Sequence, residues 1–105
     1  MLVREYIVGE GEVILLSISP PSFDFVTECF NCQWKVNSSK VEISRTSVGI
    51  DAIQSLIHAI KDAASYLYTT HDFGRARPYW TYGVNEKDLG LILPDSIKDL
   101  GDLSS

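Results

Sequence analysis

Cys29 and Cys32 are the residues whose types and spacing come closest to a reactive centre in this chain of 105 residues. A Cys-x-x-Cys pair occurs in thiol redox centres and supplies half of many zinc sites. The redox form lies at a helix N-terminus, where the helix dipole stabilises the thiolate. A zinc site needs two further ligands, yet the chain has no other cysteine and only two histidines, neither with ligands at zinc spacing.

The segment around the two cysteines has the alternation of a half-buried strand. Over residues 25–36, Phe30, Cys32 and Trp34 share one parity, and Cys29 belongs to the other. Successive side chains of a strand point to opposite faces, so two residues an odd number apart diverge. We therefore predict one buried and one outward cysteine, with no metal and no cofactor.

His58 is a candidate general base on a predicted helix. Asp62 follows it by one turn and could orient the imidazole, and Asp51 lies about two turns earlier. The same spacing is typical of the solvated face of an ordinary helix. We favour the solvated face.

His71, Asp72, Arg75 and Arg77 form the richest cluster of catalytic residue types. Arginines beside a histidine suit a phosphate or a carboxylate, so a small enzyme or ligand-binding domain is one interpretation. It predicts that the four side chains converge in one concave pocket. No nucleophile or glycine-rich phosphate loop accompanies them, and basic residues are also favoured where a helix ends, so we favour a structural role.

The C-terminal third also has the composition of a protein interface. Arginine and tyrosine are typical interface anchors, and aspartates spaced by four and three would share one face of a terminal helix and meet a basic surface. A solvated tail is the simpler explanation of these aspartates. The predicted partner-binding residues are Arg75, Arg77, Tyr79, Tyr82, Asp95, Asp99 and Asp102.

The elements that must position these residues follow from hydrophobic periodicity. Strands are predicted at residues 2–8, 12–19, 25–36 and 40–47, with short connections that favour an antiparallel meander. Residues 49–69 have the period of one long amphipathic helix, with Gly49 or Ser47 as its cap.

We therefore expect a two-layer α+β domain, in which an antiparallel four-stranded meander packs on one long amphipathic helix and an irregular C-terminal segment follows. Residues 1–94 form this single domain, and residues 95–105 are an acidic C-terminal tail.

The helix pattern also predicts which face meets the sheet. The apolar arc consists of Ile50, Ile53, Leu56, Ile57, Ile60, Ala63, Ala64 and Leu67. Trp80 is expected in the core. One helix covers only one side of four strands, so Val13, Leu15 and Phe25 on the other side should be covered by the C-terminal segment or by a partner.

Composition excludes several classes of function. With 45% apolar and 22% charged residues, the chain has the composition of a globular domain. The net charge of −5 argues against nucleic acid as a partner, because duplex binding needs surplus cations. No apolar run approaches the ~20 residues of a membrane span, and no secretory signal is evident. A cytoplasmic location is therefore expected.

Two segments carry a resemblance to known proteins. The stretch G-I-D-A-I-Q-S-L at residues 49–56, the lone Trp80, and D-L-G-L-x-L-P at 88–94 resemble a family of short bacterial proteins of unknown function. Ser55 stands where alanine is usual in that family. The resemblance covers roughly residues 45–94, implies strands followed by a long helix, and implies no catalytic residue. The chain is also loosely similar to immunity proteins that neutralise bacterial toxins.

These observations favour a non-catalytic, protein-binding domain. The specific hypothesis is an immunity protein that occludes the active site of a basic toxin domain, such as a nuclease, through steric block and charge complementarity. The alternatives are the small enzyme or ligand-binding domain centred on His71, Asp72, Arg75 and Arg77, and a structural homo-oligomer paired through a strand edge or the outer sheet face.

Overall fold

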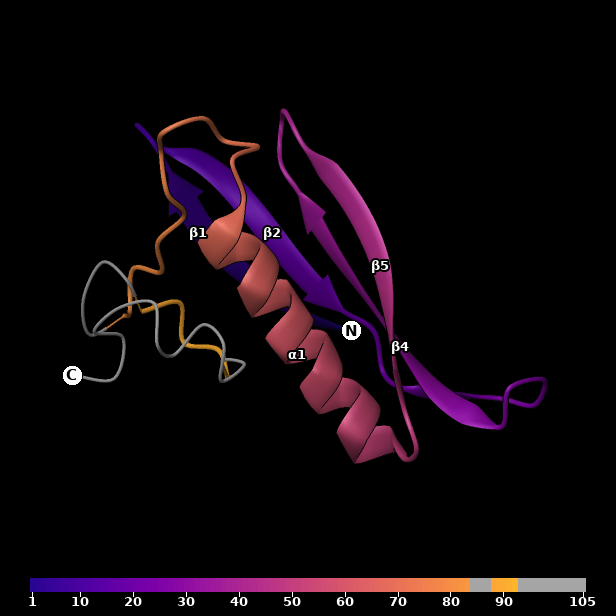
Figure 1. Ribbon diagram of the computed structural model, residues 1–105. Coiled ribbons are helices and arrows are strands. Elements are labelled where there is room, and N and C mark those ends of the chain that lie inside the picture. Colours follow the sequence, from indigo (N-terminus) through magenta and orange to yellow (C-terminus); the bar gives the residue numbers. More distant parts are fainter. Residues whose placement is uncertain (84–87, 93–105) are drawn as a thin grey trace.

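The computed structural model describes residues 1–83 and 88–92, which form an antiparallel sheet with one helix packed against it. The elements in chain order are β1 (Leu2–Val8), β2 (Glu12–Ile18), β3 (Ser22–Asp24), β4 (Cys29–Asn37), β5 (Glu42–Gly49) and α1 (Ala52–Thr69). Figure 1 shows α1 lying obliquely across one face of the sheet. The prediction of a two-layer α+β fold is confirmed.

The sheet has five strands, one more than predicted. The long strands lie in the order β1, β2, β4, β5, and β3 pairs with β4 on the side that β2 occupies. Strand β2 pairs with the second half of β4, and β3 pairs with residues 29–31. Pro20 and Pro21 separate β2 from β3 because proline has no N–H for the ladder. The prolines interrupt this edge of β4 without ending it.

A tight turn replaces the first part of the strand predicted at 25–36. Strand β4 begins only at Cys29, and the preceding residues connect it to β3. Asp24 organises this turn: its side chain accepts the Val26 N–H at 2.9 Å, and its carbonyl accepts the Glu28 N–H at 2.8 Å. A side chain that satisfies a backbone donor two residues on favours a turn over a strand.

The core lies between α1 and one face of the sheet. Alternate residues of each strand point inward, as the pairs Tyr6–Ile14 and Val36–Ile43 illustrate. The buried apolar side chains are Tyr6, Val8, Ile14, Leu16, Ile18, Cys32, Trp34 and Val36 from the sheet, Ala59, Ala63, Ala64 and Leu67 from the helix, and Leu89.

The helix presents most of the predicted face: Ala63, Ala64 and Leu67 are buried, and Leu56 and Ile60 pack against the core. Its buried residues are Ser55, Ala59, Ala63, Ala64 and Leu67, whereas Ile53 is 72% exposed and Ile50, just before the helix, is 79% exposed. Small side chains let the helix axis approach the sheet closely. A Cβ on Gly49 would lie 2.8 Å from Cα of Ser55, so β5 and α1 already touch there. The predicted arc was wrong at Ile50 and Ile53, because small side chains such as Ser55 and Ala59 make the close contact with the sheet instead.

The helix cap also differs from the prediction. The N-cap is Asp51, not Gly49 or Ser47, and its carboxylate accepts the Gln54 N–H at 2.7 Å. In return, Oε1 of Gln54 accepts the Ile50 N–H at 2.7 Å. These bonds satisfy donors that the first turn of a helix leaves free.

The sequence predicts that the C-terminal segment or a partner covers Val13, Leu15 and Phe25 on the outer sheet face. Among the described residues, no segment buries them. Val13 and Leu15 stay partly exposed and Phe25 is fully outside the core. The C-terminal segment instead meets the edge of β1, where Tyr79 and Ile7 exchange two backbone hydrogen bonds. In the described ranges, no helix is long and apolar enough to cross a membrane.

Candidate functional site

The two cysteines diverge as predicted. Both are free thiols; Cys32 is buried on the inner face, and Cys29 is partly exposed on the opposite parity of β4. Sγ of Cys32 donates to the Ser19 carbonyl at 3.3 Å, and burial raises the pKa of this thiol. Residues 1–83 and 88–92 contain no group of three or more His, Cys, Asp or Glu side chains placed to hold a metal.

His58 and Asp62 are engaged with β5 separately. Nδ1 of His58 lies 2.7 Å from the Val48 carbonyl oxygen. Asp62 accepts a hydrogen bond of 2.5 Å from Ser47, whose hydroxyl accepts from the indole N–H of buried Trp34 at 3.3 Å. Asp62 therefore anchors the helix to the sheet through a chain of hydrogen bonds that satisfies a buried indole.

The predicted cluster of His71, Asp72, Arg75 and Arg77 does not act as one group, because Asp72 and Arg77 make separate structural contacts. Asp72 accepts from the Tyr66 hydroxyl at 2.7 Å. Arg77 donates to the Thr70 carbonyl at 2.6 Å, which satisfies an acceptor at the helix C-cap. A groove between β1, β2 and the loop after the helix is lined by Asp72 and Phe73 but not by His71, Arg75 or Arg77. The structure does not bring the four residues together there.

Arg75, Arg77, Tyr79 and Tyr82 are all exposed, as an interface would require. Tyr79 nevertheless pairs its backbone with Ile7, and Tyr82 packs against Trp80 with ring centroids 5.9 Å apart. Asp95, Asp99 and Asp102 lie outside the described residues.

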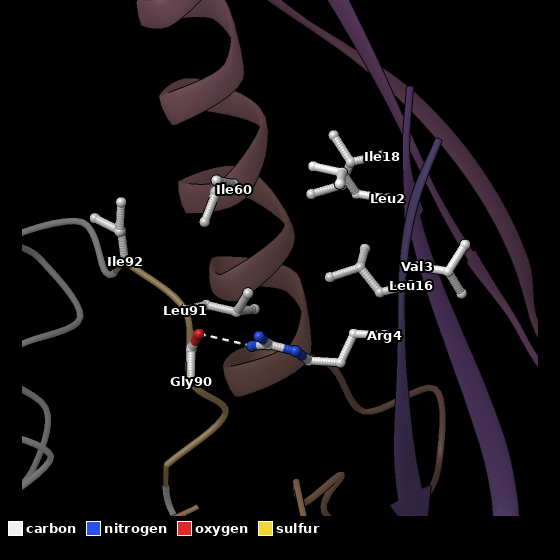
Figure 2. Close-up of a pocket in the computed structure, with 9 residues that line it drawn as sticks. All are labelled: Leu2, Val3, Arg4, Leu16, Ile18, Ile60, Gly90, Leu91 and Ile92. Carbon is white, nitrogen blue, oxygen red and sulfur yellow. Dashed lines mark hydrogen bonds between the residues drawn. The ribbon is translucent and has the colours of Figure 1, made fainter. Parts of the chain in front are cut away.

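Trp80 belongs to a contact that the sequence did not predict. The guanidinium of Arg4, from β1, lies 4.1 Å above the Trp80 ring and donates to the carbonyls of Gly90 at 2.7 Å and Leu89 at 3.2 Å. Figure 2 shows the arginine reaching from the strand to residues 90–91. The sequence signal for this contact is strand parity: Arg4 and Tyr6 lie two residues apart in β1 and therefore share a face.

Two tyrosines, the buried Tyr6 and the partly buried Tyr68, hold the same segment. The hydroxyl of Tyr6 donates to the Leu89 carbonyl at 2.8 Å, and the hydroxyl of Tyr68 accepts the Leu89 N–H at 3.0 Å. Burial raises the pKa of Tyr6 to about 12 and also raises that of Tyr68. We call residues 88–92 the latch segment, because side chains from β1 and α1 hold it against the sheet.

The strongest candidate for a binding surface is the β3–β4 hairpin, at the opposite end of the molecule from the loop after α1 (Figure 1). Phe25 is 84% exposed and Val26 is 92% exposed. Phe23 packs edge-on against Phe25 and Phe30, with centroids 4.9 and 5.2 Å apart. We call these residues, Phe23, Phe25, Val26 and Phe30, the hairpin tip.

The hairpin tip rests on a well-defined turn. Asp24 accepts from Val26, and this backbone bond is the main cause that lowers the pKa of its carboxyl. Glu28 adopts a left-handed backbone with φ of 57°, which is uncommon for a residue other than glycine. This surface was missed in the sequence because residues 25–28 were assigned to a strand. Asp24, followed by the polar residues Thr27 and Glu28, was the signal for a turn.

Comparison with known proteins yields a family and nothing closer. Residues 4–92 match the family model described as "Domain of unknown function (DUF6968)". No curated protein and no solved structure matches the chain. The match spans all six elements, including the hairpin tip and the latch segment, apart from the first residues of β1.

Proposed function

We infer that this chain, which belongs to the DUF6968 family, is a protein-binding domain that makes contact through its hairpin tip. The observation that carries this proposal is the exposure of Phe25 and Val26, at 84% and 92%, on a hairpin that projects from the sheet. Fully burying such a side chain is worth about 1.5–3 kcal/mol. A partner's apolar pocket would recover that energy.

The turn lowers the cost of binding. Asp24 fixes the backbone of Val26 and Glu28, and the edge-on contacts of Phe23 limit the motion of Phe25. A loop that is already ordered loses less conformational entropy when it binds. An aromatic anchor on a rigid support is typical of interface hot spots.

Charge supports a basic partner. Two acidic residues of the hairpin, Asp24 and Glu28, flank Phe25 and Val26 in the sequence, and the whole chain carries a net charge of −5. Acidic groups around an apolar centre steer a basic surface and fix its orientation. We propose specifically an immunity-type protein of bacterial origin that binds a basic toxin domain in the cytoplasm and blocks its active site.

The predicted surface around Arg75 and Tyr82 is the second candidate contact. It is exposed, but Arg77 and Tyr79 beside it also serve internal contacts. Phe25 and Val26 of the hairpin tip, in contrast, lie in the turn between β3 and β4 and outside both strands. We therefore assign the hairpin tip the primary role in the proposal.

The test is co-expression with the product of the neighbouring gene, followed by a pull-down and titration calorimetry. The double variant Phe25→Ser, Val26→Ser should weaken the complex by about a hundredfold or more, since two exposed apolar anchors are removed. Ile50→Ser removes a similarly exposed side chain elsewhere and should leave affinity unchanged.

Two results would refute the proposal at different levels. Equal affinity of the double variant and the wild type would remove the hairpin tip from the interface. Absence of both a complex and protection from toxicity would exclude the immunity role.

A further inference from the structure

A second surface, which shares no residue with the hairpin tip, has the features of a small-molecule site. A groove of about 310 Å³ lies between α1 and strands β1 and β2, with the latch segment as its third wall. Figure 2 shows Leu16 and Ile18 of the strands facing Leu91 of the latch segment, whereas Val3 points away from the groove. Its apolar lining includes Leu2, Leu16, Ile18, Ile60, Leu91 and Ile92.

The charged side chain that lines this groove is Arg4. A guanidinium has five N–H donors. The two bonds to Leu89 and Gly90 both come from Nη1. In the described part of the chain these bonds use Nη1, and none of them involves Nε or Nη2; the Tyr6 hydroxyl also lies close to the guanidinium. Nε and Nη2 form one edge of the guanidinium, and an edge of this kind binds a carboxylate through two parallel hydrogen bonds.

The position of Arg4 is fixed before any ligand arrives. Its guanidinium is stacked on Trp80 at 4.1 Å and bonded to Gly90 at 2.7 Å. An anion that binds there would not have to order a flexible side chain, so it would lose less free energy on binding. Such a fixed cation beside an apolar wall matches a ligand with one charged end and one apolar end.

We propose that the groove binds an aliphatic carboxylate, with its carboxylate on Arg4 and its hydrocarbon chain against Leu16, Ile18 and Ile60. The volume is near the lower end of the range for ligand pockets, which favours a chain of medium length. A neutral aliphatic molecule would place no anion on this edge of Arg4. Among the described lining residues a phosphate ester would meet one cation, Arg4, whereas phosphate sites commonly combine several donors. This site is independent of the proposed protein contact.

The first test uses the wild-type protein and three probes with the same eight-carbon chain: octanoate, 1-octanol and octylamine. Amide chemical shifts and calorimetry would follow each titration. Octanoate should bind and shift the signals of Leu16, Ile18, Ile60 and Leu91. Octanol should bind about tenfold or more weakly, because a hydrogen bond between charged groups is lost. Octylamine, with a charge like that of Arg4, should not bind.

A pair of matched variants locates the site. Ile60→Phe places a larger ring in the groove and should abolish octanoate binding. Ile53→Phe makes the same change on the exposed face of the same helix, outside the groove, and should bind octanoate like the wild type. Equal binding of octanoate and octanol, no shifts at the named residues, or full binding by Ile60→Phe would each overturn the proposal.

Discussion

Gly90 shows how a single residue can decide the position of a whole segment. Its φ is +65°, and a Cβ there would lie 2.6 Å from Trp80 and 2.8 Å from Nη1 of Arg4. Asp88 accepts the Gly90 N–H at 2.8 Å and stabilises this conformation. The D-L-G stretch in the resemblance therefore has a structural explanation here, as does Asp51 at the helix cap.

Gly90→Ala should destabilise the fold by about 2–4 kcal/mol, the sum of a left-handed backbone and a steric clash. Gly74→Ala is the matched control, since φ at Gly74 is +69° and no atom lies within 4 Å of its Cβ position. It should cost only about 1 kcal/mol. Urea unfolding would give both values, and equal losses would show that the contact with Trp80 is unimportant.

Tyr6 should make stability depend on pH in the alkaline range. Burial raises its pKa in the folded state from an ordinary 10.0 to about 12. The folded protein then holds the phenolic proton more tightly than the unfolded chain. The stabilisation that Tyr6 contributes through this proton is fully present below about pH 10. It is lost as the pH rises towards 12, so the free energy of unfolding should decrease by about 2 kcal/mol.

Unfolding of the wild type and Tyr6→Phe between about pH 10 and pH 12 would test this effect. The variant should be less stable at neutral pH, because the Leu89 carbonyl loses a donor. Its stability should fall less steeply with pH, although not remain constant, since burial also raises the pKa of Tyr66 and Tyr68. Parallel curves would contradict the assignment.

At the scale of elements, the packing of α1 against the sheet depends on its smallest side chains. Ser55, Ala59 and Ala63 lie one turn apart along the buried stripe. The hydroxyl of Ser55 donates to the Ala52 carbonyl at 3.0 Å, so this polar side chain is satisfied within the helix. The bulky isoleucine at position 53 lies outside the contact.

Ala59→Leu should therefore destabilise the protein by about 2 kcal/mol or more, because the added atoms have no space between helix and sheet. Ile53→Ser should change stability by no more than about 0.5 kcal/mol, as its side chain is mostly exposed and the two residues have similar helix propensity. Thermal or urea unfolding would compare them. A larger loss of stability for Ile53→Ser than for Ala59→Leu would show that Ile53 faces the sheet, as the apolar arc predicts.

At the scale of the whole molecule, distant parts of the chain form one core. Arg4 and Tyr6 contact Leu89 and Gly90, more than 80 residues later. Leu89 is 1% exposed although it belongs to no helix or strand. The latch segment is therefore part of the domain and not an appendage to it.

Leu89→Ala should cost about 2–5 kcal/mol of unfolding free energy, as expected for a buried leucine. Leu2→Ala makes the identical change at a residue that is 62% exposed and should cost less than about 1 kcal/mol. Both variants should unfold in one transition followed by tryptophan fluorescence. A small effect at Leu89 would show that the latch segment is only loosely attached.

The sequence by itself determined the elements whose signals are local. Alternation identifies the long strands, and strand parity by itself puts Cys29 and Cys32 on opposite faces. A period near 3.6 identified α1 almost to its ends. These patterns are visible because each depends on neighbours within a few positions of the chain.

Only the tertiary structure decided which surfaces are buried and which are free. Within the face of α1 that meets the sheet, the small side chains of Ser55 and Ala59 are buried and Ile53 is not, which hydrophobicity alone does not predict. The contact between Arg4 and Gly90 joins residues that share no local pattern. The hairpin tip is exposed because Pro20, Pro21 and Asp24 end one pairing and turn the chain, so its apolar residues extend beyond the helix that covers the rest of the sheet.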